Sequence, residues 1–153
     1  MTCTERAMDT ASSGGFLDIV MFLHENRTEG CTTKAMDDSA AHGHLDIVKF
    51  LHENRTEGCS SCAFNSAAQN GFLDTVKFLH KYYPDLNCSA KALYYNASDM
   101  VQFHDVLEFL LTNKMTFASH ITTKILIEYK YQHYYECHSL LKKHFISLNQ
   151  SKK

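Results

Sequence analysis

The stretch Leu-Asp-Ile-Val-Lys-Phe-Leu-His-Glu-Asn, residues 45–54, decides the fold because the chain carries it three times at a fixed spacing. Near copies occupy 17–26 and 73–82, each 28 residues away. The connecting sequence His-Glu-Asn-Arg-Thr-Glu-Gly-Cys occurs at 24–31 and again, unchanged, at 52–59. A fixed period of roughly 20–50 residues is typical of stacked repeats, in which each unit buries its apolar face against its neighbours. The sequence therefore predicts a repeat array.

Each copy of this stretch has the pattern of a helix that is covered on several sides. At 100° per residue, the apolar side chains of 45–54 spread over an arc of about 220°, whereas a helix on the surface of a globule needs little more than about 100°. These side chains are Leu45, Ile47, Val48, Phe50 and Leu51. Such a wide arc is expected of a helix packed between its own partner and the next repeat.

A second, shorter helix is predicted before each copy. Residues 35–41 are rich in small side chains, and Thr32 or Thr33 can cap their N-terminus. Gly43 then breaks the helix, and Gly58 suits a left-handed turn in the connector. The predicted unit is a helix–turn–helix hairpin, so the fold class is all-α, an α-solenoid of stacked hairpins.

The whole chain, 1–153, is expected to form one array. Its predicted units are 7–34, 35–62, 63–91, a degenerate unit at 92–121, and a more polar last unit at 122–148. The second helices are expected near 16–26, 44–54, 72–82, 103–113 and 134–146. The first unit has no polar cap, as if the chain were cut from a longer array. Its apolar second helix, with Met21 in place of a lysine, predicts self-association.

Composition excludes several classes of protein. A hydrophobic content of 44% is typical of a globular domain, and a net charge of −2 does not favour nucleic-acid binding. The chain contains no apolar run of roughly 18 residues and does not begin with a signal-peptide pattern. We therefore expect a cytoplasmic protein with no membrane or nucleic-acid partner.

The residue types that could serve in catalysis or metal binding recur at repeat positions, which favours a structural role. Four cysteines follow the repeat spacing and are expected to be small buried residues: Cys3, Cys31, Cys59 and Cys88. An isolated Cys-x-x-Cys motif, Cys59 to Cys62, supplies too few ligands for a zinc site. The histidines at 24, 52 and 80 share one repeat position. Asp9 and Asp37 are interpreted as first-turn residues that the helix dipole favours. The expectation is no enzymatic activity, no cofactor and no metal.

The string Gly-His-Leu-Asp-Ile-Val-Lys-Phe-Leu at 43–51 resembles the second-helix signature of ankyrin repeats, Gly-His-Leu-Glu-Ile-Val-Lys-Leu-Leu. Ser39-Ala40 stands where that family has an Ala-Ala pair. The resemblance is strong over 7–80, moderate over 92–111 and weak beyond.

Two features depart from the family pattern. Lys-Ala-Met-Asp at 34–37 replaces the Thr-Pro-Leu-His box, whose Thr and His brace each unit, and the other units are altered at the same place. The period of 28 is shorter than the family's roughly 33. Because the shortening falls between hairpins, we expect tight loops rather than the β-hairpin fingers of ankyrins.

The resemblance implies a protein-interaction scaffold that binds another protein through a concave face built from first helices and loops. The family's contact positions before the glycine turn fall on Ser13, Gly14, Ala41, His42, Gln69 and Asn70, while Asp9, Asp37 and Asn65 occupy the family's His position nearby. These residues differ between units while the apolar strings do not. Both a variable binding face and drift on an unselected surface produce that difference.

Two other functions fit the sequence. The chain can be a structural remnant, or a piece of a longer array, without a dedicated partner. Alternatively, it can be a substrate adaptor whose aromatic segment Thr122–Phe145 docks an effector.

Overall fold

The structure, a computed structural model, describes residues 5–86 and 100–113, together with the single residues Ser139 and Lys143. Within these residues it contains seven helices and no strand, which confirms the all-α class. The helices are α1 (Glu5–Ser13), α2 (Leu17–Asn26), α3 (Thr33–His42), α4 (Leu45–Asn54), α5 (Ser61–Gln69), α6 (Leu73–Tyr82) and α7 (Met100–Thr112).

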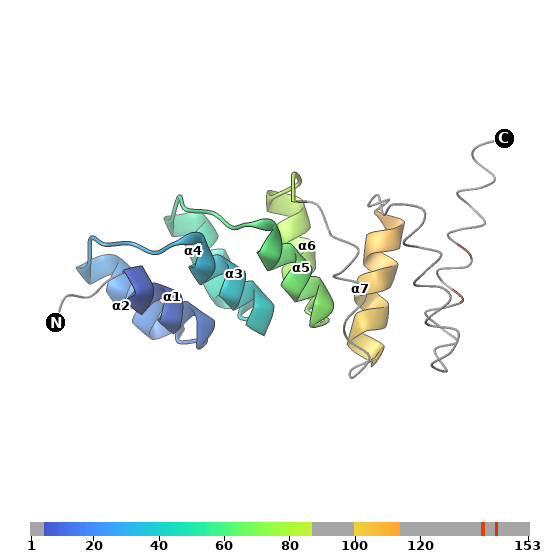
Figure 1. The fold of residues 1–153 in the computed structure, drawn as a ribbon, viewed down its shortest axis with the longest axis horizontal. Coiled ribbons are helices and arrows are strands. Elements are labelled where there is room, and N and C mark those ends of the chain that lie inside the picture. The colour runs from blue at the N-terminus through green and yellow to red at the C-terminus, as the bar shows by residue number, and fades with distance from the viewer. Residues whose placement is uncertain (1–4, 87–99, 114–138, 140–142, 144–153) are drawn as a thin grey trace.

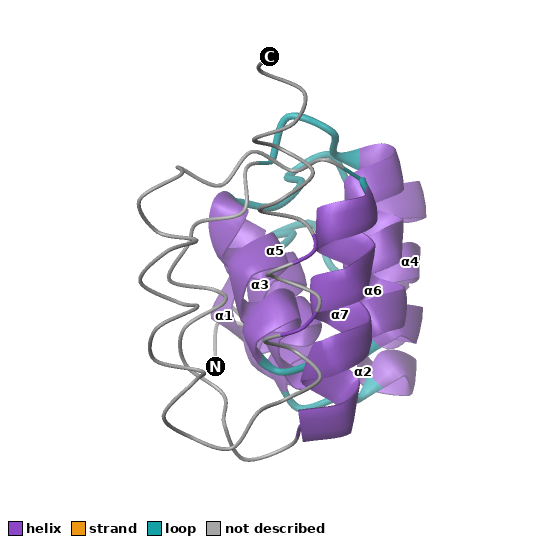
Figure 2. Ribbon diagram, turned by 90° about the vertical axis from the view of Figure 1, so that its right-hand side faces the viewer, coloured by secondary structure: helices purple, strands orange, loops and turns teal. Residues whose placement is uncertain are grey.

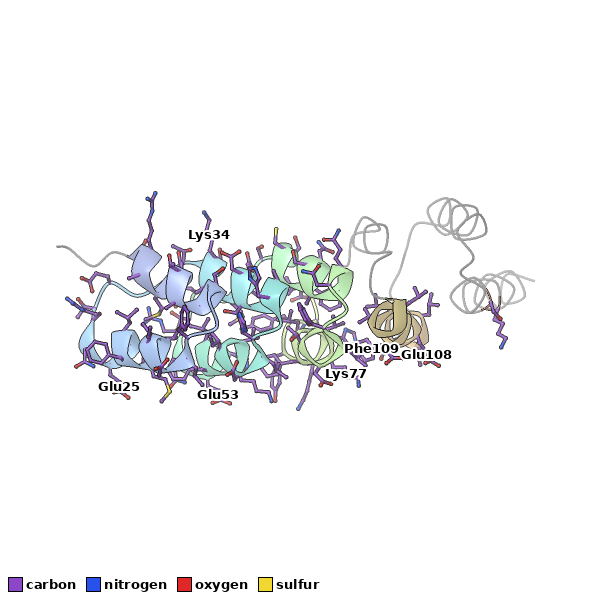
Figure 3. The ribbon with its side chains drawn as sticks, turned by 90° about the horizontal axis from the view of Figure 1, so that it is seen from below. Glu25, Lys34, Glu53, Lys77, Glu108 and Phe109 are labelled. Carbon is purple, nitrogen blue, oxygen red and sulfur yellow. The ribbon has the colours of Figure 1, made fainter. Side chains whose placement is uncertain are left out.

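The first six helices form three hairpins, which stand side by side along the long axis of the molecule (Figure 1). The first helices α1, α3 and α5 lie in one layer, and α2, α4, α6 and α7 lie in the other (Figure 2). Lys34 projects from the first layer, whereas Glu25, Glu53 and Lys77 project from the opposite face (Figure 3). No helix in the described part of the chain has the length and apolarity needed to cross a membrane.

A glycine turn separates the two helices of each hairpin. Gly43 adopts a φ of 77°, and its N–H donates to the Ala40 carbonyl at 3.3 Å while the N–H of His44 donates to the Ser39 carbonyl at 2.9 Å. This pair of hydrogen bonds is a Schellman motif, which requires a left-handed residue. The same pair recurs at Gly15 and Gly71. The predicted glycine break is thus confirmed in all three hairpins.

The core confirms the wide apolar arc of the second helices. Ile47, Val48 and Leu51 are buried, and Leu45 and Phe50 are half-buried at the two margins of the arc. The buried residues of α4 belong to a single core that also contains Met36 of α3 and Phe64 of α5. Burial on several sides is what packing between adjacent hairpins produces.

The repeated histidine joins each hairpin to the next. The ring of His24 meets that of Phe50 edge to face at 5.5 Å, and His52 meets Phe78 in the same way at 5.4 Å. His80 meets Phe109 of α7 at 5.6 Å, so α7 continues the stack. The interpretation of these histidines as structural residues is confirmed.

The predicted second helices agree with α2, α4 and α6, whereas α7 differs. It begins at Met100, ahead of the expected 103, so relative to α6 it has about one additional turn before the residue that corresponds to Leu73. The first helix of the unit at 92–121 lies outside the described residues, and so does the last second helix at 134–146 except for Ser139 and Lys143, which are helical.

The connectors at 27–32 and 55–60 contain no strand. Arg27 and Arg55 leave their helices in extended conformation, and Gly30 and Gly58 then turn the chain with φ of 77° and 67°. The expectation of loops without β-hairpin fingers is confirmed for these two connectors. Thr32 caps α3 by accepting a hydrogen bond from the N–H of Lys34 at 3.2 Å, which decides between the two predicted capping residues.

Replacement of Ser12 by alanine should stabilise the protein by roughly 1 kcal/mol, because the Ser12 hydroxyl is buried without a hydrogen-bond partner. The corresponding residues of the other hairpins are Ala40 and Ala68, both buried. Urea unfolding measures the change. Ser39→Ala is the matched control, since the Ser39 hydroxyl lies within hydrogen-bond distance of the Ala35 carbonyl at 2.5 Å and of the Ser12 carbonyl at 3.1 Å. We expect that control to destabilise; a loss of stability in Ser12→Ala would contradict the interpretation.

Candidate functional site

All nine predicted contact residues lie on the first helices or directly after them, in the layer of α1, α3 and α5. Their exposure divides them into three groups. Gly14, His42 and Asn70 are exposed; Ser13, Asp37, Ala41, Asn65 and Gln69 are half-buried; Asp9 is buried.

The three exposed residues occupy one repeat position, immediately before the glycine turn. His42 is tied only to its own hairpin: its Nδ1 lies 2.8 Å from the Asp38 carbonyl, and its ring stacks on that of His44 at 6.0 Å. Asn70 links two hairpins, since its Nδ2 donates to the Ala41 carbonyl at 2.7 Å. Each hairpin therefore presents a different residue at the same place, on a turn with the same hydrogen bonds. We call Gly14, His42 and Asn70 the turn row.

Asp9 and Asp37 join adjacent hairpins. The two carboxylate oxygens of Asp9 accept hydrogen bonds from the backbone N–H and the hydroxyl of Thr32, at 2.9 and 2.8 Å. Asp37 accepts the corresponding pair from Ser60, at 2.8 and 2.6 Å. Thr32 and Ser60 are the N-cap residues of α3 and α5. Each aspartate therefore holds the start of the next hairpin in place.

This geometry corrects the interpretation of both aspartates as first-turn residues. Asp9 is the fifth residue of α1 and Asp37 the fifth of α3, and the first turn of α3 contains no acidic residue. Their carboxylates are positioned by hydrogen bonds to the neighbouring hairpin rather than by their own helix dipole. The brace that the family obtains from Thr and His is made here by an aspartate and a capping hydroxyl.

A second set of contacts between connectors was not predicted. Glu57 forms an ion pair with Arg55 through two short side-chain contacts, and its Oε1 accepts a hydrogen bond from the N–H of Cys31 at 3.4 Å. Arg55 also lies against Gly30, where an added Cβ would clash with the guanidinium. Residues 52–59 repeat 24–31 letter for letter, yet Arg27 and Glu29 are exposed. Identical sequence thus has different surroundings in the two connectors.

The stability of the protein should depend on Glu57 at acid pH. The hydrogen bond from Arg55 lowers the pKa of the Glu57 carboxyl from 4.5 to about 2, so its stabilising contribution is present above pH about 4.5 and is lost as the pH falls towards 2. Unfolding midpoints of the protein and of Glu57→Gln, measured from pH 2 to 7, should differ most near neutrality and converge at the acid end. A difference independent of pH would contradict this assignment.

The described cysteines are free thiols. Burial raises the pKa of Cys31 to about 11 and that of Cys59 to about 12, and nearby carboxylates act in the same direction. Thiols with a raised pKa are poor nucleophiles and poor metal ligands. Among the described residues, no three His, Cys, Asp or Glu side chains gather at a place that could hold a metal ion.

Comparison with known families gives one match. Residues 31–80 match a family model described as "Ankyrin repeats (many copies)". Searches of curated proteins and of solved structures found no match. The matched range covers the second and third hairpins, from Cys31 to His80. Matching sequence, glycine-turned hairpins and their stacking agree, and they identify residues 31–80 as ankyrin repeats.

Proposed function

We propose that this protein is a non-catalytic scaffold that binds another protein through the turn row and the adjacent side chains of the first helices. Ankyrin repeats are generally protein–protein interaction modules and are typically not catalytic. The observation that carries the proposal is the turn row itself. It presents glycine, histidine and asparagine at one exposed position of three turns that share the same hydrogen bonds. A rigid frame with varied exposed side chains is the arrangement that selective binding requires.

The half-buried residues Ser13, Ala41 and Gln69 border this row and belong to the proposed face. Asp37 and Asn65 lie one helical turn further from the glycine turns. Asp9 contributes indirectly, because its carboxylate holds Thr32. We therefore place the partner contacts at the turn end of the first helices and assign the aspartates to positioning.

Photo-crosslinking in the full chain tests this proposal. A benzophenone side chain at position 42 should give an adduct with a discrete partner protein. The same side chain at position 53, on the opposite face, should not (Figure 3). His42→Ala should weaken capture of that partner, and it removes the described contacts of His42 with Asp38 and His44 of the same hairpin. Adducts of equal yield from both positions, or none from position 42, would overturn it.

We also propose self-association through α2. Phe16, Ile19 and Phe22 are 54%, 44% and 59% exposed, although Ile47, the counterpart of Ile19 in α4, is fully buried. Contiguous exposed apolar side chains mark association sites. We call Phe16, Ile19 and Phe22 the α2 edge.

A further inference from the structure

A groove of about 340 Å³ opens at the turn end of the second and third hairpins and reaches α7. Its described lining consists of Gly43, Leu45, Gly71, Phe72, Leu73, Asp74, Thr75 and Asp105. The volume lies at the lower end of the range of binding pockets, about 300–1,000 Å³. Asp74 and Asp105 hold the same position in α6 and α7, and each contributes to the lining of the groove.

One residue that lines the groove, Thr75, differs from its counterparts in the other units. Thr75 stands where α2 has Ile19 and α4 has Ile47, and it is only 2% exposed. Its hydroxyl makes no hydrogen bond to another described residue, and because its oxygen is not one of the fully buried atoms that lack a partner, it is accessible from the groove that Thr75 lines. Because the first two hairpins have isoleucine at this position, stacking of the hairpins does not require a threonine there. A hydroxyl that is accessible from a groove can accept a hydrogen bond from a ligand.

The charges of the groove point to the same kind of ligand. Asp74 and Asp105 are both exposed at its surface, and no lysine or arginine belongs to its described lining. Lys77 reaches Asp74 only at 4.0 Å, and both side chains are largely exposed, so this pair is weak. The remaining lining offers the apolar side chains of Leu45, Phe72 and Leu73.

We propose that this groove binds an arginine side chain of a partner protein. A guanidinium group carries five N–H donors and no acceptor, which suits two carboxylates and a hydroxyl. Its aliphatic stem can lie on the leucines and its planar head on the ring of Phe72. An ammonium group is a compact charge with three donors and matches this lining less well. The inference rests on the proposed function only in taking the arginine from a partner protein.

Titration of the full chain with a capped Leu-Arg-Leu tripeptide, followed by amide chemical shifts, tests the proposal. Shifts should centre on Gly43 and Gly71, and peptides with citrulline or lysine in place of arginine should bind at least about threefold more weakly. Asp105→Asn and Asp74→Asn should each weaken binding about three- to tenfold, and Thr75→Val about threefold. Asp46→Asn is the matched control: Asp46 has the same repeat position in α4, is exposed and does not line the groove.

That control should bind within about twofold of the unaltered chain, and circular dichroism should show unchanged helicity in every variant. Equal binding of the citrulline or lysine peptide would overturn the proposal. Shifts away from the groove, or an Asp46→Asn loss as large as that of Asp105→Asn, would do so as well. The crosslinking at position 42 is independent of these titrations, so the failure of either proposal is distinguishable from that of the other.

Discussion

A chain with Leu51→Ala should lose about 2–5 kcal/mol of unfolding free energy, the usual cost of truncating a fully buried leucine. Leu51 belongs to the single core that runs through the hairpins, and its side chain is almost completely covered. Truncation leaves a cavity between α4 and its neighbours. In a stack, the interfaces between units supply most of the stability, so a cavity there weakens both adjoining hairpins.

Urea unfolding followed by circular dichroism measures this loss, with Lys49→Ala as the matched control. Lys49 lies in the same helix, two residues before Leu51, and is exposed. Its truncation should cost less than about 0.5 kcal/mol. Equal midpoint shifts in the two variants would show that the buried and exposed faces of α4 have been confused.

Sequence reasoning succeeded where one feature is copied in every unit. The period of 28 residues located α2, α4 and α6, and the glycine before each of them located the turns. Periodicity reports the burial that all copies share, because each copy meets the same neighbours. For that reason the helical periodicity of residues 45–54 also predicted correctly which side chains of α4 are buried.

The contacts between units were harder to predict because they depend on pairs of residues far apart in the chain. Asp9 and Thr32 are 23 residues apart, as are Asp37 and Ser60. This repeated spacing, which ends on a capping hydroxyl each time, is a signal that could have revealed the brace. The first-turn interpretation failed because it considered each aspartate within its own helix only.

Two other features follow from where a residue stands in the stack, which no local pattern records. Arg55 and Arg27 have identical sequence neighbours, but only Arg55 lies on the glycine of a preceding connector. The groove at Thr75 includes Asp105 of α7, which lies in a unit where the repeat has degenerated. Its residues were not predicted as a site, although the change from isoleucine to threonine was visible in the sequence.

The isolated chain should associate as its concentration rises, with the α2 edge as the interface. Phe22 corresponds to Phe50 and Phe78, which are half-buried and meet the histidine of the preceding hairpin. Phe22 is the most exposed large apolar side chain of the described residues, and Ile19 lies one helical turn before it. Burial of such side chains against a partner is favourable by about 25 cal/mol per Å² of apolar surface. Burial of the α2 edge against a second copy of the chain is therefore expected to favour association.

Sedimentation velocity over a range of concentrations tests this expectation with an Ile19→Lys/Phe22→Lys double variant. The double variant should need at least about tenfold higher concentration than the unaltered chain to associate, because two lysines at the edge would have to be desolvated. Glu53→Lys, on the outer face of α4, should associate like the unaltered chain (Figure 3). At concentrations where the chain is monomeric, the amides of α2 should exchange faster than those of α4 and α6, since Ile19, Met21 and Phe22 of α2 are exposed. Strong protection of the amides at 17–23, in a chain that stays monomeric at high concentration, would refute the assignment of this edge as an interface.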